Sequence, residues 1–230
     1  MFTTEPIALT DRGSIAGRRS PNNRTGPGPC DEWSDPETGA AVDLTYWDPA
    51  WVEDQIDRVL ERYEASLGAT TAFWNTILKA QILYDKNGWL GALKARCGRP
   101  YPEELRAQII AVNHAMLRRS LPSHYNQIEK ALGRDDPVAV HHRITALLAS
   151  YFDVLFALNH SPHPGEKRLL ATAAQLEKQP EAMEVDVRAV LRACPSPDEE
   201  LLAALTRLLD RLDALLAQEG FDPRTSQQAG

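Results

Sequence analysis

The sequence predicts a mainly α-helical protein, a helical bundle with a small α/β segment on its N-terminal side. Three observations lead to this fold class. After Gly88, apolar residues recur every three or four positions along almost the whole chain, which is the period of a helix. Prolines stand where first helical turns would begin, at positions 102, 122, 137, 164 and 197. The clearest strand-like tract, AVDLTYW, lies earlier, at 41–47.

The chain divides by composition into four segments. Residues 1–40 are crowded with Pro, Gly, Asn and Asp, so they bury too little apolar area to offset their ordering entropy and are predicted to be coil or disordered. Residues 41–87 form the α/β segment, residues 88–218 the helical domain, and residues 219–230 a flexible tail.

The α/β segment begins with the predicted strand at 41–47. Asp48 is a typical N-cap and Pro49 a typical first helical residue, so a helix should start there and run to about residue 66, with Gly68 beyond its end. The rest of the segment is predicted as a helix at 71–80, a short strand at 82–85 and a turn at 86–88.

The helical domain contains seven predicted helices. They cover residues 88–96, 102–118, 122–132, 136–160, 164–178, 184–193 and 197–218. The helix at 136–160 is apolar around most of its circumference, which predicts the buried centre of a bundle. The last helix carries leucines at spacings of three and four, so it either caps the bundle or pairs with another chain.

Composition excludes several classes of protein. The chain of 230 residues has a hydrophobic share of 43% and a net charge of −7. No basic run exceeds the pairs Arg18–Arg19 and Arg118–Arg119, so binding to a nucleic-acid duplex is not predicted. No apolar run approaches the roughly 18 residues of a membrane span, and the first residues lack the form of a secretory signal. Cys30, Cys97 and Cys194 lie far apart, which favours reduced thiols in the cytoplasm.

Asp43 is the first candidate site residue. It stands between Val42 and Leu44 in the predicted strand, where a carboxylate at the end or face of a sheet can hold a divalent cation or accept a proton. The alternative is that Asp43 is an ordinary polar residue of an exposed edge strand. The residues alone leave both interpretations open.

Asp153 is the second candidate, because it lies inside the most apolar tract, YFDVLF. A buried carboxylate without a partner costs several kcal/mol, so Asp153 needs a cationic or hydrogen-bonding partner, or faces a cleft. A structural ion pair between helices and a contact with substrate both remain open.

The third candidate is the segment NHSPHPGEKR at 159–168. Its prolines and glycine break the preceding helix, and Pro164 is predicted to start the next one. Free backbone N–H groups of that first turn, together with Lys167 and Arg168, would suit a phosphate or another anion. A plain corner between helices, with solvated charges, is the alternative.

Four tracts together resemble a bacterial group of the nucleotidyltransferase superfamily, whose members combine a polymerase-β-like catalytic domain with a helical domain. The tracts are VDLTYWDPAWVEDQIDRVL, TAFWNTILKAQILYDKNGWLGALKAR, YPEELRAQII and FALNHSPHPGEKRLL. The resemblance covers about 41–218 and implies transfer of a nucleoside monophosphate from an NTP to a small-molecule hydroxyl, with Mg²⁺. It implies that the 41–87 segment is a remnant of the catalytic domain.

The resemblance also assigns site residues. Asp43 matches the third carboxylate of the superfamily, which completes the metal site or accepts the hydroxyl proton, while Asp35 and Glu37 stand as metal ligands. Lys167 and Arg168 would contact phosphate, and Asp153 the acceptor. The nucleotide preference, the acceptor and the oligomeric state are left open.

The first half of the superfamily motif departs from the pattern. Gly13-Ser14 follows a polar stretch rather than an apolar strand, and only Pro36 to Val42 separate the carboxylates at 35 and 43, where the family has a helix and strands. We therefore expect a truncated or divergent member that lacks most of the catalytic half. Two hypotheses follow: a nucleotidyltransferase, or a catalytically incomplete helical binding module that has lost the metal-binding half.

Overall fold

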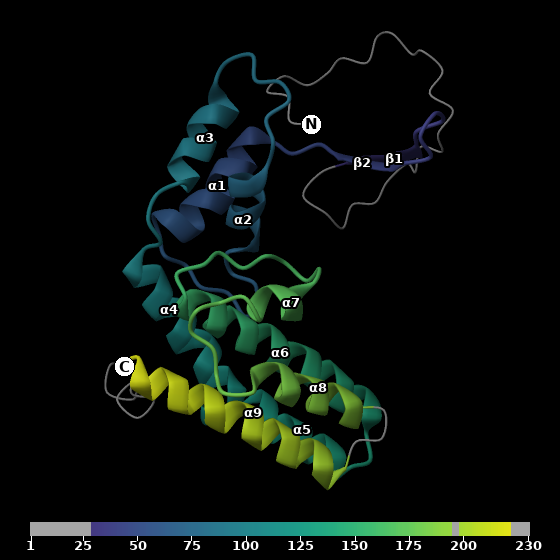
Figure 1. The fold of residues 1–230 in the computed structure, drawn as a ribbon, viewed down its shortest axis with the longest axis vertical. Coiled ribbons are helices and arrows are strands. Elements are labelled where there is room, and N and C mark those ends of the chain that lie inside the picture. Colours follow the sequence, from purple (N-terminus) through teal and green to yellow (C-terminus); the bar gives the residue numbers. More distant parts are fainter. Residues whose placement is uncertain (1–28, 195–197, 222–230) are drawn as a thin grey trace.

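The computed structural model describes residues 29–194 and 198–221, and Figure 1 shows the helices that make up most of this part of the chain. The elements are β1 Cys30–Ser34, β2 Ala41–Thr45, α1 Pro49–Leu60, α2 Ala72–Lys79, α3 Trp89–Cys97, α4 Glu103–His114, the π-helical turn η1 Ala115–Arg119, α5 His124–Leu132, α6 Pro137–Leu158, α7 Leu169–Ala173, α8 Met183–Ala193 and α9 Glu199–Gln218. The predicted mainly α fold with a small strand component is confirmed.

The two strands form one antiparallel hairpin, which projects from the end of the molecule that carries α1–α3 (Figure 1). The strand predicted at 41–47 is confirmed as β2, whereas the expectation of coil was wrong for 30–34, which is β1. The strand predicted at 82–85 was also wrong. Residues 82–84 are exposed, and no ladder holds them within the described part of the chain.

The N-terminus of α1 is capped as the sequence predicts. The Asp48 carboxylate accepts hydrogen bonds from the backbone N–H groups of Ala50 at 2.8 Å and Trp51 at 3.3 Å, and Pro49 occupies the first turn. The helix ends at Leu60, before the predicted residue 66, because Tyr63 has a left-handed backbone with a φ of 54°.

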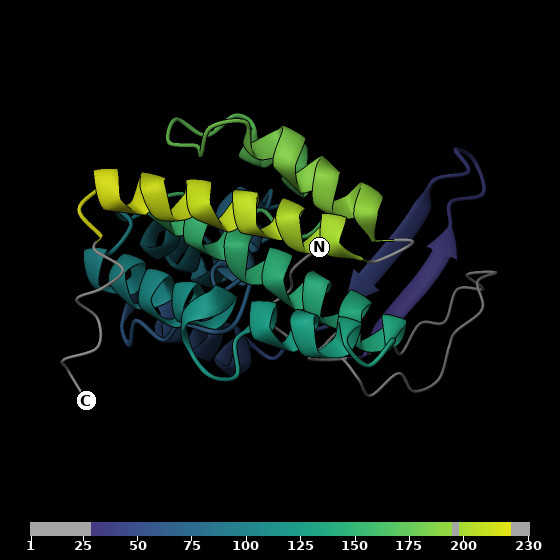
Figure 2. The ribbon, with the colours of Figure 1, turned by 90° about the horizontal axis from the view of Figure 1, so that it is seen from below.

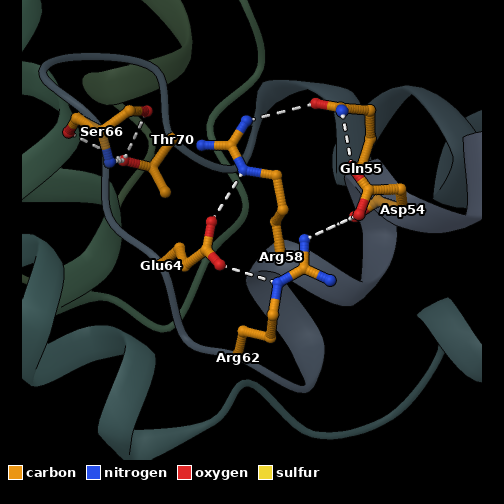
Figure 3. Close-up of polar contacts among 7 residues, drawn as sticks. All are labelled: Asp54, Gln55, Arg58, Arg62, Glu64, Ser66 and Thr70. Carbon is orange, nitrogen blue, oxygen red and sulfur yellow. Dashed lines mark hydrogen bonds and ion pairs between the residues drawn. The ribbon is translucent and has the colours of Figure 1, made fainter. Parts of the chain in front are cut away.

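After α1 ends, charged side chains hold the following loop against the C-terminal part of this helix. Arg58 and Arg62 both donate to the Glu64 carboxylate, at 3.0 Å and 2.7 Å (Figure 3). Arg62 also binds Asp54 at 2.9 Å, and Gln55 accepts from Arg58 at 3.3 Å. These exposed pairs contribute little stability individually, but together they fix the path of the loop that leads to α2.

The same loop makes a close approach to α6 at Gly68. Its φ is +77°, and an added Cβ would meet the Cβ of Ala149 at 2.8 Å. A residue with a side chain would therefore be strained by the backbone and would clash with α6. Glycine at this position brings the α1–α2 loop onto the bundle.

Helix α6 is the centre of the core, as its apolar circumference predicts. Every residue of its C-terminal part is buried, from Ser150 to Leu158. Helices α4 and α5 pack on it, and α8 and α9 lie together on the bundle (Figures 1 and 2). The leucine face of α9 is buried in the bundle, with Leu205, Leu208 and Leu212 at most 1% exposed, so α9 caps the bundle.

Two predicted helices differ in the structure. The helix predicted at 102–118 is α4 continued by the π-helical turn η1, in which the backbone takes one wide turn. The helix predicted at 164–178 is only α7, residues 169–173, because Gly165 at φ +88° and Arg168 at φ +56° prevent a helix from starting at Pro164. No helix in the described residues is long and apolar enough to cross a membrane.

Candidate functional site

Asp43 lies on the exposed face of the hairpin. It is on β2, directly opposite Glu32 of β1, so two carboxylates face each other across the ladder. Its neighbours Val42 and Leu44 are half-buried on the other face. Asp43 is therefore part of an exposed strand, and Val42 and Leu44 do not enclose its carboxylate.

Asp35 and Glu37 lie in the turn that joins the two strands. One carboxylate oxygen of Asp35 accepts hydrogen bonds from the Thr38 hydroxyl at 2.8 Å, the Thr38 N–H at 2.7 Å and the Glu37 N–H at 3.1 Å. These hydrogen bonds lower the pKa of Asp35 from its ordinary value, and the one from the Thr38 hydroxyl has the largest effect. The Ser-Asp-Pro-Glu sequence thus forms a turn in which the Asp35 side chain accepts from the backbone N–H groups two and three residues further on.

The three carboxylates proposed as metal ligands are not brought together as a set. Across residues 29–194 and 198–221, no group of three or more His, Cys, Asp or Glu side chains is placed to hold a metal ion. Gly13 and Ser14 lie outside the described residues. The assignment of Asp35, Glu37 and Asp43 to Mg²⁺ stays a prediction.

Asp153 is the most deeply buried candidate, with 1% of its surface exposed. Its carboxylate accepts from the Thr70 hydroxyl at 2.6 Å, from the Thr70 N–H at 3.1 and 3.2 Å, and from the Asn113 amide at 3.2 Å. Of the partners that the sequence left open, hydrogen-bonding ones are present, and both are neutral. The structural ion pair between helices was wrong, since no salt bridge to Asp153 exists in the described part of the chain.

Burial raises the pKa of Asp153 to about 6, against the opposing effect of the hydrogen bonds from Thr70 and Asn113. Asn113 extends the network, because its amide accepts from the Gly68 N–H at 2.9 Å and donates to the Ser66 carbonyl at 2.9 Å. Ser66 and Thr70 also bind each other within the same loop (Figure 3). Asp153 therefore joins α6 to α4 and to the α1–α2 loop.

His163 anchors the loop at 161–168 to Thr71 and to Phe156 of α6. Its backbone N–H donates to the Thr71 hydroxyl at 2.7 Å. The residue is 2% exposed, and the centre of its ring lies 5.1 Å from that of Phe156. The Gly165 N–H donates to Nδ1 of His163 at 3.1 Å, so a neutral ring carries its proton on Nε2. Burial lowers the pKa of His163 to about 4.

The residues before this loop are fixed as well. The Asn159 side chain accepts from the Lys178 N–H and donates to the Lys178 carbonyl, both at 2.8 Å. His160 lies against the Glu103 carboxylate at 2.5 Å, which connects the end of α6 to the start of α4. The loop is thus held at its beginning and in its middle.

Lys167 and Arg168 lie on the exposed end of this loop, after Glu166. Neither cationic side chain has an ion-pair partner among the described residues. The helix that was expected to begin at Pro164 and offer its N-terminus to an anion is absent, which corrects that part of the prediction. The two adjacent cations remain as candidate anion ligands.

The sequence-predicted site residues fall into three separate places. Asp35, Glu37 and Asp43 are on the projecting hairpin, Asp153 is inside the bundle, and Lys167 and Arg168 are on the surface loop before α7 (Figure 1). Sequence reasoning missed Thr70, Asn113 and the anchoring role of His163. The only signal for Thr70 was its place in the pair Thr70-Thr71, shortly after Gly68.

A family model described as a domain of unknown function, DUF4037, matches residues 72–169. The match begins at the first residue of α2 and ends at the first residue of α7, so it includes Asp153, Lys167 and Arg168 and leaves out the hairpin. No curated protein matches the chain.

Proposed function

We propose that the chain is a helical binding module of the nucleotidyltransferase type, which holds a phosphate-bearing ligand at the loop 161–168. The observation that carries this proposal is the pair of exposed cations, Lys167 and Arg168, on a loop fixed by His163 and Asn159. A fixed loop loses little conformational entropy when it binds, so its charges are already positioned for an anion.

The resemblance supports the choice of ligand. In the superfamily that the sequence resembles, the helical domain follows a domain that handles nucleoside triphosphates, and the tract FALNHSPHPGEKRLL contains this loop. A nucleoside triphosphate offers the multiple negative charges that two adjacent cations suit. Binding at this loop requires only charge and shape, and it does not involve the hairpin carboxylates.

We expect ATP, in the presence of EDTA, to raise the melting temperature of the chain by about 3–5 °C at about ten times its dissociation constant. The double variant Lys167→Ala/Arg168→Ala should lose most of this shift, because it removes both exposed cations of the loop. Differential scanning fluorimetry with ATP, GTP, CTP and UTP measures it.

A matched control is the double variant Lys130→Ala/Arg134→Ala, which removes two exposed cations near the end of α5. It should keep the full ATP shift. An equal loss of the ATP shift in both double variants would mean that the shift depends only on the net charge of the chain. The absence of any shift at millimolar ATP would also contradict the proposal.

Nucleotidyl transfer is the second candidate function. The observation that favours it is the pair Glu32 and Asp43, two carboxylates directly opposite each other on an exposed face. Like charges in this position destabilise the ladder, and a divalent cation between them would relieve the repulsion. In this function Asp43 would hold Mg²⁺ or accept the proton of the acceptor hydroxyl, with the NTP as the second substrate.

If the chain is a transferase, Asp43→Asn should abolish incorporation from labelled NTP into acceptor, and it should remove the part of the ATP thermal shift that depends on Mg²⁺. The melting temperature without ligand should stay within about 1 °C of wild type, because the exposed Asp43 side chain contributes little packing. Glu181→Gln, an exposed carboxylate elsewhere, is the control. A Mg²⁺-dependent shift that survives in Asp43→Asn would rule out this role.

A further inference from the structure

The β1–β2 hairpin has two edges that are unpaired within the described residues. Its strands pair only with each other there, in the register Cys30–Thr45 to Ser34–Ala41. A two-stranded hairpin is marginally stable by itself in water and gains stability from a third strand or a packed face. An open edge is also the place where another chain adds a strand.

The ladder fixes which backbone groups face outward. Hydrogen bonds from Tyr46 N to Pro29 O at 3.0 Å and from Asp35 N to Ala40 O at 2.8 Å bracket the strands. In an antiparallel pair, hydrogen-bonded and non-hydrogen-bonded residue pairs alternate. The opposed pair of Glu32 and Asp43 is therefore of the non-hydrogen-bonded type, and both residues direct their N–H and C=O groups away from the ladder.

The side chains of these same two residues define one face of the hairpin. Glu32 and Asp43 are exposed on it, while Trp33, Val42 and Leu44 are half-buried on the opposite face. The outward backbone groups and the acidic side chains thus belong to the same residues. A strand added at either edge would meet an acidic face on one side and a more apolar face on the other.

The negative charge of the hairpin indicates which kind of strand could add to its edge. Residues 30–45 carry five carboxylates and no Lys, Arg or His. The carboxylates are Asp31, Glu32, Asp35, Glu37 and Asp43. Edge-to-edge pairing with a second copy would bring like charges together on the acidic face, which is destabilising. A basic segment would instead place opposite charges beside Glu32 and Asp43.

We infer that the hairpin binds an extended segment of another protein by strand addition, and that basic residues alternate with apolar residues in this segment. Successive side chains of a strand point to opposite faces, so every second residue would lie beside Glu32 or Asp43 and the residues between would lie beside the Trp33 face. Backbone hydrogen bonds to Glu32 or Asp43 set the position of the segment, and the alternation sets its specificity. This surface is separate from the loop 161–168.

The test uses a synthetic peptide, acetyl-Lys-Val-Lys-Val-Lys-Val-Lys-amide, carrying a fluorescent label, and the full chain. Fluorescence anisotropy should show saturable binding that weakens at least about tenfold between 50 and 300 mM NaCl. The double variant Glu32→Lys/Asp43→Lys should bind at least about tenfold more weakly. Glu177→Lys/Glu181→Lys makes the same change in net charge at exposed positions elsewhere, and it should bind within about twofold of wild type.

A second peptide separates strand addition from simple charge attraction. Methylation of alternate backbone nitrogens removes the N–H donors along one edge and keeps every charge, so it should weaken binding at least about tenfold. Equal binding of the methylated peptide, equal loss in the two double variants, or no binding at about 1 mM peptide would each overturn the inference. Light scattering that shows a dimer of the wild-type chain, lost in Glu32→Lys/Asp43→Lys, would assign the surface to a second copy and overturn it as well.

Discussion

Asp153→Ala should lower the free energy of unfolding by about 2–4 kcal/mol at pH 7. The substitution leaves the Thr70 N–H without its acceptor, which costs about 1–3 kcal/mol, and it removes the hydrogen bonds that the Thr70 hydroxyl and the Asn113 amide donate to the buried carboxylate. The removal of a desolvated charge recovers part of this loss, since burial raises the pKa of Asp153 to about 6. Urea denaturation followed by far-UV circular dichroism measures the change.

Two further variants make the interpretation specific. Asp153→Asn keeps an acceptor oxygen of the same size, so it should be less destabilising than Asp153→Ala. Asp43→Asn, on the exposed hairpin, should be neutral within about 0.5 kcal/mol. A stability of Asp153→Ala equal to or above that of wild type would show that the network around Thr70 and Asn113 is not what joins α6 to the loop, and would return Asp153 to the list of substrate contacts.

Asp153 and His163 should give opposite pH dependences of stability. The pKa of Asp153 is raised in the folded state, so the folded protein binds more protons than the unfolded chain between about pH 4 and 6. The contribution of Asp153 to stability is therefore largest below about pH 4 and is lost as the pH rises to about 6. The pKa of His163 is lowered to about 4, so its contribution is complete above about pH 6.5 and is lost as the pH falls.

Denaturation between pH 4 and pH 7 should therefore change in opposite senses in two variants. In wild type, the ionisation of Asp153 lowers the free energy of unfolding as the pH rises. Asp153→Asn lacks this effect, so its free energy of unfolding should rise by about 2–3 kcal/mol relative to that of wild type between pH 4 and pH 7. His163→Asn, which keeps an acceptor near the position of Nδ1, should lose a similar amount over the same range. Parallel curves for wild type and both variants would contradict the burial of these two groups.

The fold was predictable where local signals determine it. Asp48 and Pro49 set the start of α1, and the apolar circumference of α6 placed it at the centre. The strand β1 was missed because CDEWS contains little apolar alternation and is held mainly by pairing with β2. The helix expected after Pro164 was wrong because the backbone at Gly165 and Arg168 turns left-handed, which proline alone does not reveal.

The candidate site was predictable only in part. The hydrophobic surroundings of Asp153 showed that the carboxylate needed a partner, yet Thr70 lies 83 positions away in the chain and Asn113 lies 40 away. Neither pairing has a local signature, because tertiary packing alone brings the α1–α2 loop onto α6. The cations of the loop 161–168 were identifiable from the sequence, but their exposure depends on how His163 anchors the loop.

The most direct test of the binding-module proposal is a titration of the ¹⁵N-labelled chain with ATP in EDTA, followed by amide chemical shifts. The proposal predicts that the largest shifts occur at Gly165 to Arg168, that they saturate at millimolar ATP, and that they vanish in Lys167→Ala/Arg168→Ala. Shifts concentrated on residues 30–45 of the hairpin, or no saturable shift at the loop, would contradict it.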